Sequence, residues 1–396
     1  MEQTNLVKKG IVFALGSYLP GTQTWIYNQL KFLNSTQILI LSSTLHPDRR
    51  QFPLKHHKLF SFPNLGILDN IGLPRRIIRR LMRLFLIDSK LDILIFAWKA
   101  KRHRCSLIHA HFANIGYGFI PVARILGVPL LIAFYGYDYD YLPNSRPKWK
   151  RRYQKLFRHG TLFLTEGEYG RKRLIEKGAL PDRVKVHHLG IDVDQVPFKV
   201  RSLSQGQVLR LVQVSAFGEK KGHRILIEAM EILKERKIIE NISLTLIGDG
   251  PLKEKIIFLT QKYHLDKYII FGDHIQYQNL HEELLRYHIF VHPSITTPEG
   301  DCEGGAPVVL LDAQATGMPV ISTFHCDIPE EVLHAETGML VPEGDFKALA
   351  DAILLFLDNP ALLEKYGAAG REHVKENYSA QKQSQRLADL YSDLIN

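Results

Sequence analysis

The chain has 396 residues, which is too long for one ordinary hydrophobic core and favours two domains. Its 45% hydrophobic and 23% charged content is ordinary for a soluble globular protein. The three cysteines follow no disulfide or metal spacing, and no run of about 18 uncharged apolar residues occurs, so we expect a reducing compartment and no membrane span. The net charge of +10 indicates an anionic partner: nucleic acid, anionic lipid or a phosphorylated substrate.

The N-terminal segment opens as nucleotide-binding folds do. Residues 11–15 are an apolar run that predicts a buried first strand, and a turn-rich loop then leads to a helix in TWIYNQLKFLN, with Thr22 or Thr24 as its cap. A strand that ends in glycine before a helix is a generic signal. Gly16 is therefore a candidate ligand contact, and a simple turn glycine is the alternative. Residues 37–43 predict the second strand.

Two basic stretches follow residues 44–73, which are predicted to be irregular. Apolar residues at helical spacing alternate with arginines over 75–85, which predicts a basic amphipathic helix, and the second stretch, 146–160, interleaves Trp149 and Phe157 with lysines and arginines. We interpret both as a surface that docks on an anionic membrane, although a plain solvated helix stays open; no motif supports nucleic acid binding. The predicted membrane-surface residues are Arg75, Arg76, Arg79, Arg80, Arg83, Lys148, Trp149, Arg151 and Arg152.

A histidine pair ends the next predicted strand. His109 and His111 are two residues apart, so their side chains point to the same face of the strand. A helix is predicted to begin directly after them, and ligands bind at this carboxyl edge of open parallel sheets. The position favours a functional pair over two core histidines. In the loop after the following strand, we expect Asp138 to cap the loop or to bond an acceptor rather than hold a metal.

The second half repeats the alternation of strands and helices, which predicts parallel sheets with helices on both faces. Residues 199–206 have the composition of a linker, so the predicted domains are 1–200 and 206–378. A lysine just before a glycine at a helix start, here Lys221, can meet phosphate as a point charge. The GDGP turn at 248–251 lacks the spacing of a P-loop.

One further segment predicts a strand ending near His292, an acidic loop, a helix over 306–316 stopped by Gly317, and a strand in MPVIST. The pair Gly304-Gly305 at the helix start leaves backbone N–H groups free for a phosphate, which the helix dipole favours. Acidic groups such as Glu303 suit sugar or ribose hydroxyls. A plain βαβ unit with a polar loop is the alternative.

EGGAPVVLLDAQATGMPVIST followed by IPE, together with HAHFAN, EKKG and GDGP, resembles the signature of the retaining GT-B glycosyltransferases of family 4. The closest branch builds bacterial exopolysaccharides and lipid-linked oligosaccharides, and the resemblance covers nearly the whole chain. It implies an α/β GT-B fold of two Rossmann-like parallel-sheet domains facing an interdomain crevice. It also implies that the C-terminal helix, 379–396, packs back on the first domain, and that the enzyme uses a nucleotide-diphosphate sugar with no cofactor and no metal.

The resemblance also implies roles for single residues. The implied catalytic residues are His111 and Glu303. The implied donor-binding residues are Lys221, Gly304, Gly305, Asp312, Gly16, His274 and Ile275. The implied acceptor-side residues are His109, Tyr135 and Asp138. Three positions depart from the family pattern: Asp312 replaces a glutamate at a spacing one residue longer, Ala216 replaces an arginine, and Tyr135 replaces a histidine.

The sequence therefore predicts a metal-independent retaining glycosyltransferase, bound peripherally to the cytoplasmic face of the membrane, that acts on a lipid-linked or glycan acceptor. A soluble enzyme of the same fold that makes a free glycoside, or a sugar-nucleotide epimerase, is the first alternative. The acceptor-side loops HAHFAN and FYGYD count against an epimerase. A catalytically weak nucleotide-sugar binding protein is the second alternative, which Ala216 favours and the intact His111 and Lys221 disfavour.

Overall fold

The computed structural model describes residues 10–20, 23–33, 37–54, 57–61 and 90–395. The chain forms two compact units: unit 1 is Met1–His187 with Gln381–Asn396, and unit 2 is His188–Ala380. The first unit thus ends before the predicted linker at 199–206. The reason is that the chain joins unit 2 directly after His187, where Ile191 pairs with Ser379 and Val193 packs into a buried cluster of that unit.

The sheet of unit 1 has seven parallel strands in the order β3-β2-β1-β4-β5-β6-β7 among the described residues. The strands are β1 (Gly10–Tyr18), β2 (Gln37–Leu45), β3 (Lys58–Ser61), β4 (Cys105–His111), β5 (Leu130–Ala133), β6 (Leu162–Thr165) and β7 (Val184–Val186). The prediction that residues 44–73 are irregular is therefore wrong for β3, at Lys58–Ser61. β3 is a short, half-exposed edge strand, so it lacks the apolar run by which a buried strand is predicted.

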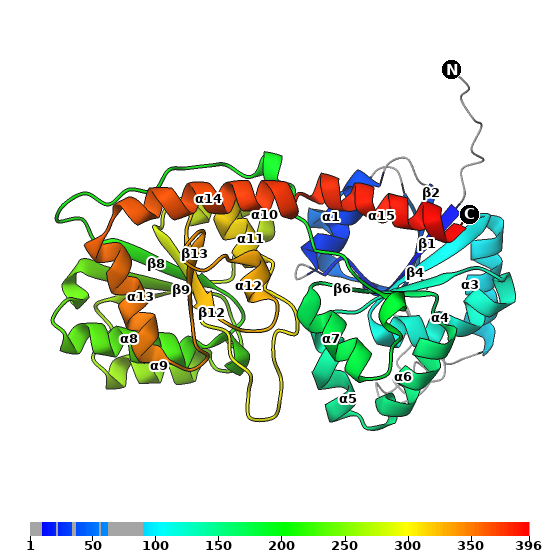
Figure 1. The fold of residues 1–396 in the computed structure, drawn as a ribbon, viewed down its shortest axis with the longest axis horizontal. Helices are drawn as coiled ribbons and strands as arrows, with labels where there is room; N and C mark the ends of the chain where they lie inside the picture. Colours follow the sequence, from blue (N-terminus) through cyan, green and yellow to red (C-terminus); the bar gives the residue numbers. More distant parts are fainter. Residues whose placement is uncertain (1–9, 21–22, 34–36, 55–56, 62–89, 396) are drawn as a thin grey trace, which may run out of the picture. The chain divides into compact units, whose positions relative to one another are not determined.

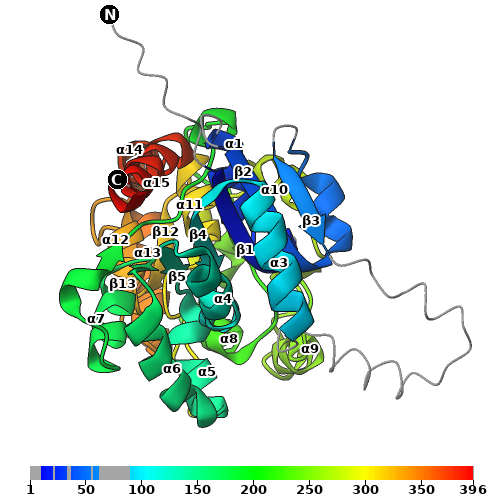
Figure 2. The ribbon, with the colours of Figure 1, turned by 90° about the vertical axis from the view of Figure 1, so that its right-hand side faces the viewer.

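Helices cover both faces of this sheet. They are α1 (Thr24–Phe32), α3 (Lys90–Arg102), α4 (Ala113–Leu126), α5 (Leu142–Ser145), α6 (Lys148–His159), α7 (Glu168–Glu176) and α15 (Ala380–Ile395). α4 packs between α3 and α6 on one face (Figure 2). α15 lies beside α1, where the Ser384 hydroxyl donates to the Gln29 carbonyl. Thr24 is the first residue of α1 and does not cap it, and Thr22 lies outside the described residues.

Unit 2 contains six parallel strands in the order β10-β9-β8-β11-β12-β13 within the described part of the chain. The strands are β8 (Leu209–Val214), β9 (Ile242–Ile247), β10 (Ile269–Gly272), β11 (Ile289–His292), β12 (Val320–Thr323) and β13 (Gly338–Val341). The helices are α8 (His223–Glu235), α9 (Lys253–Lys262), α10 (Tyr277–Leu284), α11 (Val309–Ala315), α12 (Ile328–Glu331), α13 (Phe346–Asp358) and α14 (Ala361–Asn377). α8 packs against α9 and α13, and α11 packs against α14 and α10 (Figure 1).

Buried side chains lie on both faces of the unit 2 sheet because successive residues of a strand point to opposite sides. In β8, Leu211 belongs to the cluster that contains the apolar side chains of α8, whereas Val212 belongs to the cluster that contains Leu310 and Met318. This pattern accounts for the nearly continuous apolar runs in the strands. It also leaves the loops at the carboxyl ends of the strands as the places for polar, chemically useful side chains.

Both sheets reverse their strand order at one pair of neighbours, β1 and β4 in unit 1 and β8 and β11 in unit 2. Loops that leave two such neighbours turn away to opposite faces of the sheet and open a crevice, the usual ligand site of doubly wound sheets. His111 ends β4 and Gly16 lies near the carboxyl end of β1, while Lys221 follows β8 and Glu303 follows β11. These four predicted residues thus lie at the two reversal points.

α6 is amphipathic, but its aromatic side chains face the core. Trp149 is 4% exposed and Phe157 is 6% exposed, and both join Tyr153 and Leu156 in the apolar stripe that packs on α4. The prediction that Trp149 lies on a membrane-facing surface is therefore wrong. Residues 149, 153, 156 and 157 recur at helical spacing, so they form one face of the helix and the basic residues form the other. Arg75, Arg76, Arg79, Arg80 and Arg83 lie outside the described residues.

None of the helices in the described ranges is both long enough and apolar enough to cross a bilayer.

Candidate functional site

In unit 2, an ion pair joins the loops that follow β8 and β11. The Lys221 ammonium lies 2.8 Å from both carboxylate oxygens of Glu303, and the Ser294 hydroxyl donates to Glu303 Oε1 at 3.0 Å. His292 Nε2 lies 3.5 Å from the same oxygen. The predicted residues Lys221 and Glu303 are thus brought together, although the spacing from Glu303 to Asp312 departs from the family pattern.

Burial and charge act against each other on Glu303. Burial alone would raise its pKa, but the Lys221 ammonium and the nearby His292 hold the pKa of Glu303 well below its usual range. The carboxylate is therefore ionised at neutral pH and depends on Lys221 for its partner. A buried anion and a partly exposed cation at the carboxyl edge of a sheet can together receive a polar ligand that carries both hydroxyl and phosphate groups.

The loop that carries Lys221 needs a glycine at the next position. Gly222 has a φ of 68°, and a Cβ there would lie 1.8 Å from the Pro293 carbonyl oxygen. The loop after β8 therefore packs directly against the start of the loop after β11, and the Ile295 N–H donates to the Lys220 carbonyl at 2.9 Å. This close backbone approach sets the position of Lys221 relative to Ser294 and Glu303.

The acidic loop is also held by the segment that follows β12. His325 Nε2 accepts the Glu303 N–H at 3.0 Å, and His325 Nδ1 lies 2.7 Å from Glu343 Oε1. The Gly304 N–H bonds the Cys326 sulfur, and the Gly305 carbonyl accepts the Asp327 N–H. The expectation that the glycine pair stands at a helix start is wrong, since both glycines lie in the loop before α11, and a contact of either amide with a phosphate stays a prediction. α11 begins three residues later than predicted, at Val309, because Pro307 and the glycine pair extend the loop.

Asp312 is nearly buried, at 2% exposed, and lies against α10. Its Oδ1 accepts the Tyr277 hydroxyl at 3.1 Å and lies 2.8 Å from His281 Nε2. Both partners come from one face of α10, the helix that follows the loop of His274 and Ile275. A contact of Asp312 with ribose hydroxyls stays a prediction.

Ala216, where the family pattern has an arginine, is an exposed residue of the loop after β8. Burial and the positive fields of His292 and Lys221 lower the pKa of His223, so its ring lies near the Lys221 cluster. Neither His223 nor Arg224, however, bonds Lys221 or Glu303. The His223 ring is buried and stacks on Phe217, with centroids 4.3 Å apart, and Arg224 pairs with Glu228 on the outer side of α8. A second cation does lie near the cluster: Lys220 binds the Asp301 carboxylate at 3.2 Å.

In unit 1, the two histidines of β4 are fully buried. Their rings stack with centroids 4.2 Å apart, His109 Nδ1 lies 2.8 Å from the Tyr391 hydroxyl of α15, and His111 Nδ1 lies 2.6 Å from the Tyr135 hydroxyl. Burial, together with the positive field of His187, lowers the pKa of His111 to about 3. His111 is therefore neutral at physiological pH and can offer an uncharged imidazole nitrogen.

Asp138 and Tyr135 are also buried, at the turn that follows β5. The Tyr135 N–H donates to Asp138 Oδ2 at 3.1 Å, and burial raises the pKa of Asp138 to about 7. Each of the predicted acceptor-side residues His109, Tyr135 and Asp138 therefore faces the interior of unit 1. We assign Tyr135 and Asp138 to holding the turn after β5 in place and His109 to packing α15 on β4, and a direct contact of any of the three with an acceptor stays a prediction.

An open pocket of about 300 Å³ lies at the carboxyl ends of β1 and β4. Its lining residues are Leu15, Gly16, Ser17, Gln23, Phe112, Asn114, Ile115 and Tyr137. Gly16 is the only predicted site residue among them. Phe112 has a φ of 76°, a rare backbone conformation for a bulky residue and one that occurs more often at functional sites.

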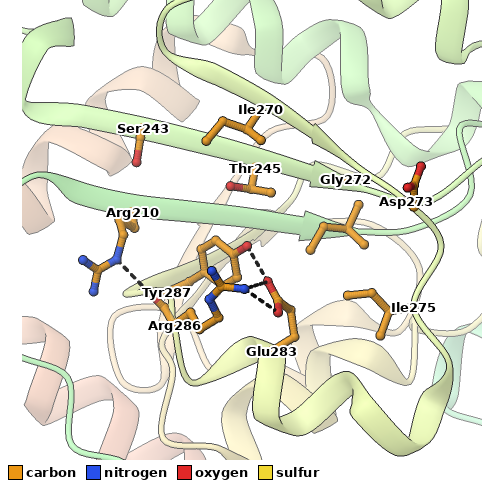
Figure 3. Close-up of a pocket in the computed structure, with 11 residues that line it drawn as sticks. Arg210, Ser243, Thr245, Ile270, Gly272, Asp273, Ile275, Glu283, Arg286 and Tyr287 are labelled. Carbon is orange, nitrogen blue, oxygen red and sulfur yellow. Dashed lines mark hydrogen bonds and ion pairs between the residues drawn. The ribbon is translucent and has the colours of Figure 1, made fainter.

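A second cavity, of about 690 Å³, lies on the face of strands β8, β9 and β10 (Figure 3). Glu283, near the end of α10, lies on the opposite wall. Its carboxylate accepts the Tyr287 hydroxyl at 2.8 Å and pairs with Arg286 at 3.0 Å. Ile275 reaches this cavity, while His274 is exposed beside it. The cavity shares no residue with the Lys221–Glu303 cluster, so it is a separate feature of unit 2.

Several residues of these sites escaped the sequence-based prediction. They are Ser294, His292, His325, Glu343, Lys220, Gln23, Asn114 and Tyr137. Most stand in loops directly after strands, which is the one signal that could have selected them. The contact of Ser294 with Glu303 depends on the path of the acidic loop, which the sequence pattern does not specify.

Two family models match the chain. The model described as "Glycosyltransferase Family 4" matches residues 58–195, and the model described as "Glycosyl transferases group 1" matches residues 197–373. The two matches cover unit 1 from β3 to β7 and most of unit 2, and α15 lies outside both.

Curated relatives agree with these matches. WcaL of Salmonella typhimurium, which carries the name of a colanic acid biosynthesis glycosyltransferase, is 33% identical over 76% of this chain and 75% of its own length. AmsK of Erwinia amylovora, an amylovoran biosynthesis glycosyltransferase, is 30% identical over 73% of this chain and 70% of its own.

Solved structures share the fold at low identity. The structure of HepE from Anabaena in complex with UDP aligns with a TM-score of 0.74 and 16% identity, covering 98% of this chain and 100% of that one. A sucrose-phosphate synthase from Thermosynechococcus elongatus aligns with a TM-score of 0.75 and 18% identity, covering 98% and 99%. At this identity the likeness establishes the fold alone.

Proposed function

The chain belongs to the GT-B glycosyltransferases of family 4, and from this premise we propose that it transfers a sugar from a nucleotide-diphosphate sugar to a lipid-linked or glycan acceptor in polysaccharide or glycolipid biosynthesis. The observation that carries the proposal is the Lys221–Glu303 pair at the strand-order reversal of unit 2. Its support comes from relatives named for colanic acid and amylovoran biosynthesis and from HepE, whose structure holds UDP.

In the proposed mechanism, Lys221 exchanges its contact with Glu303 for the diphosphate of the donor. Negative charge grows on the diphosphate as the bond to the sugar breaks, and a fixed ammonium stabilises that charge more in the transition state than in the ground state. Glu303, freed from Lys221, accepts hydroxyls of the donor sugar. The Gly305 amide and Asp312 serve the diphosphate and the ribose, and His274 and Ile275 lie beside the base.

Retention of the anomeric configuration and independence of metal are parts of the same proposal. No carboxylate is assigned as a covalent nucleophile, so the proposal has no covalent sugar–enzyme intermediate. The acceptor hydroxyl then attacks the anomeric carbon on the same face from which the diphosphate leaves. Neutral His111 serves the donor sugar as a hydrogen-bond partner through its imidazole. A transfer reaction that runs unchanged in EDTA and yields a product with the donor's anomeric configuration would support both parts.

We further propose that the protein works at the cytoplasmic face of the membrane as a peripheral protein. The exposed face of α6 carries Lys148, Lys150, Arg151, Lys155 and Arg158 with no acidic residue among them, and the chain carries a net charge of +10. Such a face attracts anionic lipid headgroups, and each basic residue near the surface contributes about 1 kcal/mol.

A catalytically weak nucleotide-sugar binding protein is the second candidate, favoured by one observation: Ala216 is exposed and neither His223 nor Arg224 takes the place of the family's arginine. Donor hydrolysis separates the two candidates. The transferase proposal expects the wild type to hydrolyse one nucleotide sugar slowly, and His111→Ala to lose that activity while it still binds the nucleotide. Equal inactivity of both proteins with the donor bound would favour the binding protein.

A further inference from the structure

The chain after β5 forms one turn of π-helix, Tyr137–Tyr141, that runs directly into α5. The Leu142 N–H donates to the Tyr137 carbonyl, five residues back, which is the hydrogen bond of a π-turn. Such turns are rare and occur often at functional sites. Within this turn the side chains divide sharply, since the three in the middle are buried and the two at the ends are exposed.

The buried side chains fasten the turn to unit 1. The Tyr139 hydroxyl donates to the Phe134 carbonyl at 2.8 Å, and Tyr139 packs so closely on α7 that a Cβ at Gly170 would lie 2.5 Å from its ring. Asp140 binds Arg173 and, at 3.1 Å, Lys177. The turn is therefore a rigid support, and its two end residues are held in place at little further cost in conformational entropy.

The exposed end residues form an aromatic pair. Tyr137 is 39% exposed and Tyr141 is 43% exposed, and their ring centroids lie 5.5 Å apart at an interplanar angle of 40°. Large aromatic side chains are usually buried, so two adjacent and exposed rings on a turn that is fastened to the core indicate a binding surface. Neither hydroxyl has a hydrogen-bond partner among the described residues, which leaves both available to a ligand.

Tyr137 also lines the 300 Å³ pocket at the reversal point of unit 1. The pocket combines apolar surface from Phe112 with hydrogen-bonding groups from Ser17, Gln23 and Asn114. A pyranose ring matches this mixture. One of its faces presents C–H bonds that pack on the negative face of an aromatic ring, and its edges present hydroxyls for amide and hydroxyl side chains.

From this geometry we propose that Tyr137 and Tyr141 form a binding platform for a pyranose ring of the acceptor, with Asn114 and Gln23 bonding its hydroxyls. The inference rests on the proposed function and deepens it, because it makes the acceptor's recognised end a sugar and not a bare lipid phosphate. The platform carries no charge of its own, so it would contribute little to the binding of an isolated phosphate group.

Saturation-transfer NMR tests the platform without knowledge of the natural acceptor. The probes are the methyl α- and β-glycosides of glucose, galactose, mannose and fucose at millimolar concentration, in the presence of UDP. We expect at least one glycoside to receive saturation from the wild type, strongest at the protons of one ring face. Tyr137→Ala and Tyr141→Ala should each lower that signal at least fivefold, whereas Tyr137→Phe should keep most of it because the ring face remains.

The matched control is Phe258→Ala, which removes an exposed aromatic side chain from α9 in unit 2 and should leave the signal unchanged. A wild type that saturates no glycoside, or alanine variants that saturate as strongly as the wild type, would overturn the proposal. The thermal shift with UDP, measured on the same samples, reports the donor site independently. A protein that responds to UDP but to no glycoside would refute the platform and leave the proposed function standing.

Discussion

Under the proposed function, the Lys221–Glu303 pair would serve two states of the protein, one without and one with the donor. In the structure each charge neutralises the other, with the Glu303 side chain 7% exposed and that of Lys221 19% exposed. A donor diphosphate would compete with Glu303 for the ammonium, and the released carboxylate would then bind sugar hydroxyls. The pair therefore keeps two costly charges stable until a ligand replaces the contact.

Removal of the lysine charge alone should destabilise unit 2. In Lys221→Met the buried Glu303 carboxylate loses its partner, so the free energy of unfolding should fall by about 3 kcal/mol. The double variant Lys221→Met with Glu303→Gln should recover most of this loss, because no buried charge remains. Urea unfolding of the wild type, both single variants and the double variant measures the coupling, and additive effects of the two substitutions would contradict the pairing.

Asp138 should make stability depend on pH in a definite direction. Burial raises its pKa from 3.8 to about 7, so between these values the folded protein keeps a proton that the unfolded chain has lost. The folded state then binds more protons, and the contribution of Asp138 to the free energy of unfolding falls as the pH rises through this window, by about 4 kcal/mol in total, and is constant above it.

The measurement is urea unfolding of the wild type and of Asp138→Asn at several values between pH 4 and 8. The difference in the free energy of unfolding between the two proteins isolates the effect of Asp138. It removes the effect of the buried histidines, whose titration makes stability rise with pH. We expect the wild type to lose stability relative to Asp138→Asn as the pH rises towards 7. Parallel profiles over the whole range would show that the carboxyl is ionised when folded.

For single residues, the sequence could identify which side-chain types are suited to a site and at which predicted strand ends they stand. His111 was selected because it ends a predicted strand, and Lys221 because it precedes a glycine at a predicted helix start. The catalytic roles of His111 and Glu303 came from the family resemblance. The burial of His109 could not be predicted, since it depends on α15, whose Tyr391 reaches β4 from the far end of the chain. The burial of Asp138 depends on contacts of the turn after β5, such as the Tyr135 N–H, that no sequence pattern specifies. Ser294 lacked any local signal, because its partner is set by the path of the acidic loop.

Among the elements, α6 has two faces with different roles. Trp149, Tyr153, Leu156 and Phe157 pack against unit 1, while the basic side chains face outward. Composition alone suggested aromatic and basic residues acting together on one surface. Helical geometry separates them, and the same periodicity that predicted the helix, applied residue by residue, would have placed Trp149 in the core.

Two kinds of substitution in α6 should therefore have different effects. Lys148→Glu with Arg151→Glu should lower binding to vesicles that contain phosphatidylglycerol at least thirtyfold, or about 2 kcal/mol, with little change in stability. Trp149→Ala should lower the free energy of unfolding by about 3 kcal/mol or more and leave vesicle binding of the folded protein intact. Vesicle sedimentation at low salt, beside urea unfolding, makes the comparison. If the variant with both charges reversed still binds vesicles, the proposal that α6 docks on the membrane is contradicted.

For the other helices and strands, sequence patterns predicted that an element exists and its place in the chain order better than its first and last residues. β1, β4 and β11 lie where apolar runs placed them, and α8 begins where the lysine before a glycine predicted a helix start. α11 starts late because Pro307 and the two glycines before it delay the first helical turn, and β3 was missed because an exposed edge strand has no continuous apolar run.

On the scale of the whole molecule, the two units differ in how they are built from the chain. Unit 2 is continuous, whereas unit 1 is completed by α15 from the C-terminus. Leu387 and Tyr391 of α15 are buried, and Tyr391 touches the β4 histidine His109. The position of this helix was implied by the family resemblance alone, since nothing in its own periodicity names the sheet on which it packs.

Truncation after Ala380 should therefore damage unit 1 and spare unit 2. Without α15, the histidine pair of β4 and the apolar side chains around it would face water, so unit 1 should unfold at a lower denaturant concentration. Unit 2 keeps its own hydrophobic core and the Lys221–Glu303 cluster. Hydrogen exchange read by mass spectrometry should show lost protection in β1 and β4 and unchanged protection in β8 and β11. Equal loss in both units would contradict the division.

The central claim is that unit 2 holds a nucleotide-diphosphate sugar through Lys221. The most direct measurement is a thermal-shift panel of UDP, GDP, ADP and their sugar conjugates at fixed salt, on the wild type, on Lys221→Ala, and on Lys262→Ala as a control for an exposed lysine. A ligand present at 100 times its Kd adds about 2.7 kcal/mol of stability. The account predicts a clear shift with one base, kept in Lys262→Ala and lost in Lys221→Ala. No shift with any nucleotide, or a shift that survives in Lys221→Ala, would contradict it.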